Sequence, residues 1–109
     1  MPKFLTIGYG DEAGYEGTAQ SVRDAAHRHD AALLEAGAII GRADAPLQVR
    51  NHDGAEVEVR EGAFLSSELP LAGFAIIEAH SLDEAVRLAS QAPCAVAQGV
   101  VEVWPLELG

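Results

Sequence analysis

The strongest structural signal in the chain is the sequence Leu71-Ala72-Gly73-Phe74-Ala75-Ile76-Ile77, followed after three residues by Ser81-Leu82-Asp83-Glu84. The first segment is almost entirely apolar, which is typical of a strand at the centre of a sheet. The second is a capping box, in which the serine oxygen accepts a backbone amide hydrogen bond while the glutamate reaches back. We therefore expect a helix that begins at Leu82 and ends before Pro93. Its inner side would be formed by Leu82, Ala85, Val86 and Ala89.

The first part of the chain has the same order of strand and helix. Phe4-Leu5-Thr6-Ile7 is a short apolar strand, and the acidic, glycine-containing segment 11–17 after it is typical of a loop. Residues 18–36 have apolar side chains at helical spacing, and Gly37 follows as the C′ residue. The helix would bury a stripe made of Val22, Ala25, Ala26, Ala32, Leu33 and Ala36, and further strands are expected at 38–40 and 100–104.

Residues 47–60 predict a β-hairpin. The segments 47–50 and 56–60 alternate between apolar and polar residues. Asp53-Gly54 between them favours a tight turn, because a type I′ turn needs positive φ at both central residues. The alternation predicts one apolar face and one wet face, the apolar one formed by Leu47, Val49, Val57 and Val59.

The element order is thus β-α-β, a hairpin and β-α-β, which predicts one domain over residues 1–109. Two helices on one antiparallel sheet indicate the α+β class, as a ferredoxin-like sandwich with an inserted hairpin. Two helices cannot cover both faces of a sheet. We therefore expect the free face to meet its counterpart in a second subunit, as a homodimer.

The composition limits the class of partner. The chain has 109 residues, with 17 Asp and Glu against 7 Lys and Arg, and a formal net charge of −10. Such an acidic chain is unsuited to nucleic acid or to an anionic membrane surface, both of which need a basic face. The single cysteine cannot form an intrachain disulfide, and the sequence has neither an export signal nor a membrane-spanning run. These features predict a cytoplasmic protein.

Five segments form an ordered pattern that extends over nearly the whole chain. They are Phe4–Glu12, Glu35–Gly41, Val57–Phe64, Leu71–Glu78 with the helix start Ser81–Ala85, and Gly99–Pro105. This pattern resembles the YCII-related proteins, and specifically their DGPF branch. Glu61-Gly62-Ala63-Phe64 stands where that branch has Asp-Gly-Pro-Phe, so the glycine and phenylalanine are kept and the proline is absent.

The resemblance implies a ferredoxin-like fold and a homodimer of the dimeric α+β barrel kind. In this family a histidine on the first helix and an aspartate after the second strand have been proposed as a catalytic pair. Some relatives are linked to lyase-like chemistry on small ring compounds, which implies a small-molecule lyase-type enzyme. Others are encoded beside extracytoplasmic-function sigma factors, which implies the alternative of a non-catalytic ligand-binding or regulatory dimer linked to stress-response transcription.

Three residues are candidates for such a catalytic pair: His29, His27 and Asp44. The family's helix histidine aligns with Ala26, beside His27, whereas His29 lies on the apolar stripe and so faces the sheet. In a pair of this kind the imidazole carries the proton and the carboxylate fixes its tautomer. The alternatives are a packing role for His29, with a hydrogen bond to a backbone carbonyl, and a solvated helix flank for His27.

Tyr9, Asp11 and Phe64 are candidates for ligand binding, because a phenol and a carboxylate can orient a polar ligand and Phe64 belongs to the tetrapeptide near the expected cleft. The alternatives are that Tyr9 packs at the sheet edge and that Asp11 caps or bends its loop. We expect no cofactor and no metal, since two histidines two residues apart on a helix point about 200° apart. Cys94 has no basic neighbour and is expected to be inert.

Overall fold

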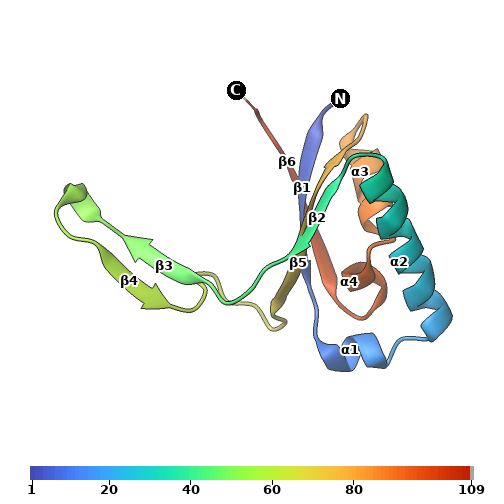
Figure 1. Ribbon diagram of the computed structural model, residues 1–109, viewed down its shortest axis with the longest axis horizontal. Helices are drawn as coiled ribbons and strands as arrows, with labels where there is room; N and C mark the ends of the chain where they lie inside the picture. The colour runs from blue at the N-terminus through green and yellow to red at the C-terminus, as the bar shows by residue number, and fades with distance from the viewer. Residues whose placement is uncertain (109) are drawn as a thin grey trace.

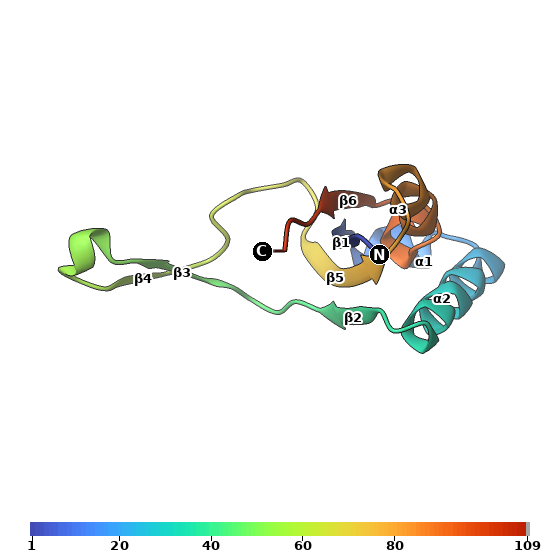
Figure 2. The same ribbon diagram turned by 90° about the horizontal axis from the view of Figure 1, so that it is seen from above.

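The structure is a computed structural model that describes residues 1–108 (Figure 1). Within these residues, helices cover one side of a four-stranded sheet, and a separate hairpin extends from the other side (Figures 1 and 2). Along the chain the elements are β1 (Lys3–Tyr9), α1 (Glu12–Glu16), α2 (Gln20–Glu35), β2 (Ile39–Arg42), β3 (Leu47–Arg50), the 3₁₀ turn η1 (His52–Gly54), β4 (Glu58–Glu61), β5 (Leu71–Glu78), α3 (Leu82–Ala89), α4 (Pro93–Val96) and β6 (Val100–Pro105).

The main sheet has the strand order β2-β5-β1-β6, and its neighbouring strands are antiparallel. The apolar segment 71–77 lies inside β5, between β1 and β2, which confirms its prediction as a central strand. With α2 before β2 and α3 before β6, this is the ferredoxin-like α+β arrangement that the sequence predicts. The hairpin β3–β4 is inserted between β2 and β5 and forms a small sheet of its own.

The two faces of the main sheet differ in what covers them. Side chains alternate between the faces along each strand, so Phe4 and Thr6 of β1 are buried under the helices while Leu5 and Ile7 point the other way. No helix of residues 1–108 lies on that other side, which we call the bare face (Figure 2). From the strand register, its side chains are those of Leu5, Ile7, Tyr9, Ile39, Phe74, Ile76, Val100, Glu102 and Trp104.

The hydrophobic core lies between α3 and the end of the sheet where β1 begins. Phe4 and Ile77 of the sheet pack there with Ala85 of α3. The predicted capping box sets the start of α3, since Ser81 Oγ accepts the Glu84 amide at 3.1 Å and Glu84 Oε1 accepts the His80 amide at 3.4 Å. Small alanines on the inner side bring α3 close to the sheet, whereas Leu82 and Val86 are about half exposed.

Two expectations about the first helical region need correction. The segment 11–17, predicted as a loop, contains α1, because Asp11 Oδ1 accepts the Gly14 amide at 2.8 Å and caps a short helix. Helix α2 spans nearly the predicted residues, but of its apolar stripe only Ala26 is buried and Leu33 half-buried. The inward line of α2 is completed by polar side chains instead, those of Arg23, His29 and Asp30.

The hairpin forms as predicted but does not lie on the domain. Asp53 and Gly54 have φ of 60° and 67°, in agreement with the turn signal, although they belong to a 3₁₀ turn within a longer loop. Val49 pairs with Val59, so the predicted apolar face exists. Within the single chain no other element covers this apolar face, because Leu47, Val49, Val57 and Val59 are all exposed.

Candidate functional site

A cavity of about 900 Å³ lies between the helices and the covered face of the main sheet. It occupies the end of the sheet away from the hydrophobic core, and residues of β1, α1, α2, β2, β5 and α4 line it. This is the size of a small-molecule site. The side chains able to carry chemistry or charge there are those of Asp11, Glu12, Tyr15, His27, Asp30, Arg42 and Cys94.

Glycines keep the floor of the cavity open. Gly8 of β1 and Gly73 of β5 are register partners on the covered face, at positions where Thr6 and Ala75 further along carry side chains. A Cβ on Gly8 would lie 2.8 Å from Cys94 Sγ, and a Cβ on Gly73 would lie 2.8 Å from the Gly41 carbonyl oxygen. The covered face therefore holds a packed core at one end and a cavity at the other.

His27 and Tyr15 form the best-defined polar contact at the cavity. The Tyr15 hydroxyl lies 2.7 Å from His27 Nε2, with the ring centroids 6.0 Å apart. The Arg23 guanidinium sits 4.8 Å from the centre of the Tyr15 ring, a cation–π contact that holds the phenol from its other side. The cap that Asp11 places on α1 fixes the position of Tyr15, so the contact between Tyr15 and His27 joins α1 to α2.

Asp30 and Cys94 are two half-buried acidic groups of the cavity lining. Asp30 follows His27 by three residues on α2, which places both on one helix face. Burial raises the pKa of Asp30, while the nearby charges of His29 and His27 act to lower it. Burial also raises the pKa of the Cys94 thiol, and the negative charge of Asp30 raises it further. A thiol with a raised pKa is a weak nucleophile at neutral pH, which agrees with the expectation that Cys94 is inert.

The structure does not bring His29 and Asp44 together. His29 Nε2 lies 2.8 Å from the Leu88 carbonyl oxygen, so its imidazole joins α2 to α3 and is absent from the cavity wall. This is the packing arrangement that the sequence left as the alternative. Asp44 is exposed, and its carboxylate accepts the amide of Ala45 at 2.7 Å.

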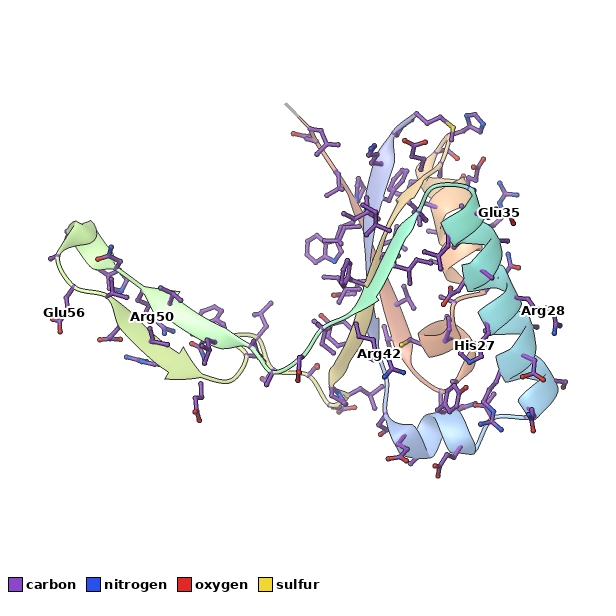
Figure 3. The ribbon with its side chains drawn as sticks, viewed as in Figure 1. His27, Arg28, Glu35, Arg42, Arg50 and Glu56 are labelled. Atoms are coloured by element: carbon purple, nitrogen blue, oxygen red, sulfur yellow. The ribbon has the colours of Figure 1, made fainter. Side chains whose placement is uncertain are left out.

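The reason for the separation is where β2 ends. The strand stops at Arg42, after which the chain leaves the sheet toward the hairpin, so Asp44 lies outside the cavity. Arg42 pairs with Gly73 on the covered face and lines the cavity, where the sequence predicted a carboxylate (Figure 3). His27, the other histidine candidate, does line the cavity.

The three candidate ligand-binding residues lie in three different places. Asp11 lines the cavity while it caps α1. Tyr9 is on the bare face, since Gly8 before it faces the helices, and its hydroxyl donates to Glu102 Oε1 at 2.8 Å. Phe64 follows β4 and is exposed, with the Arg50 guanidinium 5.8 Å from its ring centre. Tyr9 and Phe64 thus have no part in the cavity wall.

Tyr15, Asp30 and Arg42 are cavity residues that the sequence reasoning missed. Asp30 carried a usable signal, because a carboxylate three residues after a histidine shares its helix face. Tyr15 gave none, since α1 was expected to be a loop. To predict Arg42 as a cavity residue, the end of β2 would have to be known to within two residues.

Comparison with known proteins places the chain in a family. The model of the YCII-related domain matches residues 3–107, and the chain therefore belongs to the YCII-related family. No curated protein matches it. In residues 1–108 no three His, Cys, Asp or Glu side chains converge as a metal site would need, and none of the described helices combines the length and apolar character of a membrane span.

Proposed function

We propose that the chain is a small-molecule enzyme of the lyase type, in which His27 moves a proton in the cavity. The observation that carries the proposal is the 2.7 Å contact between His27 Nε2 and the Tyr15 hydroxyl at the wall of a 900 Å³ cavity. Imidazole is the side chain best suited to exchange protons near neutral pH. A hydrogen-bonded partner fixes its orientation, as acid–base catalysis requires.

The neighbours of His27 support a proton-transfer role. A phenol that donates to Nε2 leaves Nδ1 to carry the proton, and a proton can move between imidazole and phenol along the same bond. Asp30 adds a carboxylate on the same helix face. Burial raises its pKa, while the charge of His29 and, to a smaller extent, that of His27 act to lower it.

The cavity wall favours a small, partly apolar substrate that carries a carboxylate. Ile40 and Val101, which both lie on the covered face, give the wall apolar surface for a ring. Arg42 is the cationic side chain of the lining, and a guanidinium matches the two oxygens of a carboxylate. Asp11 and Glu12 at α1 would repel a second anionic group.

A pair of histidine variants tests this role. We expect His27→Asn to lower kcat about 10²- to 10⁴-fold on any cyclic carboxylic acid that the wild type turns over. His29→Asn is the matched control on the same helix, and we expect it to keep kcat because its imidazole bonds Leu88 outside the cavity. A His27→Asn variant with full kcat, or a loss confined to His29→Asn, would overturn the assignment.

The alternative is a non-catalytic ligand-binding or regulatory dimer. The observation that favours it is that His27 and its contact with Tyr15 are exposed to solvent, whereas catalytic proton transfer is favoured where water is excluded. Saturable binding of the same acids by calorimetry, with no turnover of any of them, would select this alternative. Loss of that binding in Arg42→Gln would locate it in the cavity.

We also propose that the chain works as a homodimer joined through the bare face. One row of that face contains Ile39, Ile76, Leu5 and Trp104, which are register neighbours across the sheet and all apolar. An apolar row across a whole sheet is typical of a surface that another sheet covers.

A further inference from the structure

The hairpin β3–β4, residues 47–61, which we call the arm, has an apolar face that its own chain leaves uncovered. Leu47, Val49, Val57 and Val59 are between 58 and 66 % exposed. Val49 and Val59 are direct register partners, and Leu47 lies on the same face of the arm, where its register partner is Glu61. The opposite side carries Gln48, Arg50, Glu58 and Arg60, which is ordinary surface chemistry.

The arm lies apart from the domain. Its strands pair with each other and with no strand of the main sheet, and both views show it extending away from the side of the sheet opposite the helices (Figures 1 and 2). A two-stranded hairpin is at best marginally stable alone in water. An arm that exposes four large apolar side chains therefore needs a surface to pack on.

The exposed area indicates how large that surface is. The chain exposes 7729 Å², whereas a compact monomer of its mass, 11.4 kDa, is expected to expose about 5,800 Å². Its radius of gyration is 15.9 Å, against about 13 Å for a compact chain of this length. The excess of about 1,900 Å² is more than the roughly 800 Å² that each partner contributes to a stable interface.

We propose that the arm clasps a second copy of this chain, with its apolar face packed against the bare-face side of that copy. The inference rests on the homodimer proposed above and adds a second contact to it. The arm and the bare face lie on the same side of the sheet (Figure 2). A two-fold axis between two facing sheets therefore places each arm alongside the other subunit. Formation of the symmetric dimer then buries both the bare face and the apolar face of the arm.

The reach of the arm fits this arrangement. Facing sheets pack about 10 Å apart. The stretch from the end of β2 at Arg42 to the turn at Asp53 can span up to about 35 Å when extended. Each arm is therefore long enough to cross the gap between the sheets and to lie against the bare-face side of the partner.

Two variants in neighbouring positions test the clasp by sedimentation velocity. Val49→Glu and Gln48→Glu each add one negative charge, on opposite faces of the same strand. We expect Val49→Glu to raise the dimer Kd at least about tenfold, because a two-fold dimer buries the new charge twice. We expect Gln48→Glu to change it less than about twofold. Equal effects of the two variants would overturn the clasp.

Ile39→Glu on the bare face separates the clasp from the dimer itself. If Ile39→Glu dissociates the dimer and Val49→Glu does not, the bare-face dimer stands and the clasp is wrong. A wild type that stays monomeric well above micromolar concentration overturns both.

Hydrogen exchange of the wild-type protein at several concentrations is an independent test of the clasp. We expect the arm amides to become protected only at concentrations where the dimer forms. Protection that is the same at all concentrations, as from packing on its own chain, contradicts the clasp, and so does an arm that exchanges freely in the dimer.

Discussion

The covered side of the main sheet and the arm contain similar apolar residues in similar alternation, but their surroundings differ. Phe4, under the helices, is 4 % exposed, and Phe64, at the base of the arm, is 78 % exposed. On the covered side, α3 supplies a second layer through small alanines. The arm has no second layer from its own chain. The same alternation thus yields core in one region and an unpartnered surface in the other, and the difference lies in what else the chain can bring to it.

A phenylalanine-to-alanine substitution in each of the two regions measures the difference between them. We expect Phe4→Ala to lower the free energy of unfolding by about 3–5 kcal/mol, because it removes buried contacts and leaves a void. We expect Phe64→Ala to change it by less than about 0.5 kcal/mol in the dilute monomer, where the ring is solvated. Urea denaturation at low protein concentration measures both. A comparable loss for Phe64→Ala would mean that the arm packs on its own domain.

The cavity differs from both regions in holding titratable groups. Because the pKa of Asp30 is raised in the folded chain, folding binds extra protons between the ordinary carboxyl pKa and the raised one. The free energy of unfolding is therefore highest below that window, falls as the pH rises through it and stays level above. We expect Asp30→Asn to remove this fall, as measured by urea denaturation across acidic and neutral pH. Asp24→Asn, at an exposed position of the same helix, is the control and should leave the profile unchanged.

The same variant changes the reactivity of Cys94. Since the charge of Asp30 contributes to the raised pKa of the thiol, Asp30→Asn should lower that pKa, though burial will keep it above its ordinary value. The rate of alkylation by iodoacetamide, followed against pH, then shows its midpoint at a lower pH than in the wild type. An unchanged midpoint would mean that the two groups do not face each other across the cavity.

These effects show which parts of the molecule the sequence could predict. The central strand 71–77, the capping box at Ser81 and the turn at Asp53 and Gly54 follow from local patterns, and the structure confirms each of them. The cavity depends on distant contacts. The rotation of α2 about its own axis decides whether His27 or His29 faces the cavity. The Leu88 carbonyl, which binds His29, is 59 residues away in the sequence. Such a contact cannot be predicted from local periodicity. The position of Asp44 could not be predicted either, because it depends on where β2 ends.

The smallest effect is expected on the bare face, where a tyrosine and a carboxylate meet near solvent. The hydrogen bond from the Tyr9 hydroxyl to Glu102 is the main reason that the pKa of Tyr9 is raised, followed by burial and by the charge of Glu102. Glu102→Gln removes the charge and keeps an acceptor, so we expect the pKa to fall part of the way, and Glu102→Ala should lower it further. Ultraviolet titration in a Tyr15→Phe background isolates Tyr9, since the chain has two tyrosines.

The pKa of Tyr9 should also depend on protein concentration, because Tyr9 lies on the bare face that the proposed dimer covers. A bare face that becomes covered takes water away from Tyr9, and burial disfavours the phenolate. The pKa of Tyr9 should therefore be higher above the dimer Kd than below it, and Ile39→Glu should abolish the difference by keeping the chain monomeric. If Tyr9 titrates identically at all concentrations while sedimentation shows a dimer, the subunits meet elsewhere, and the arm and the bare face would then be separate surfaces with separate partners.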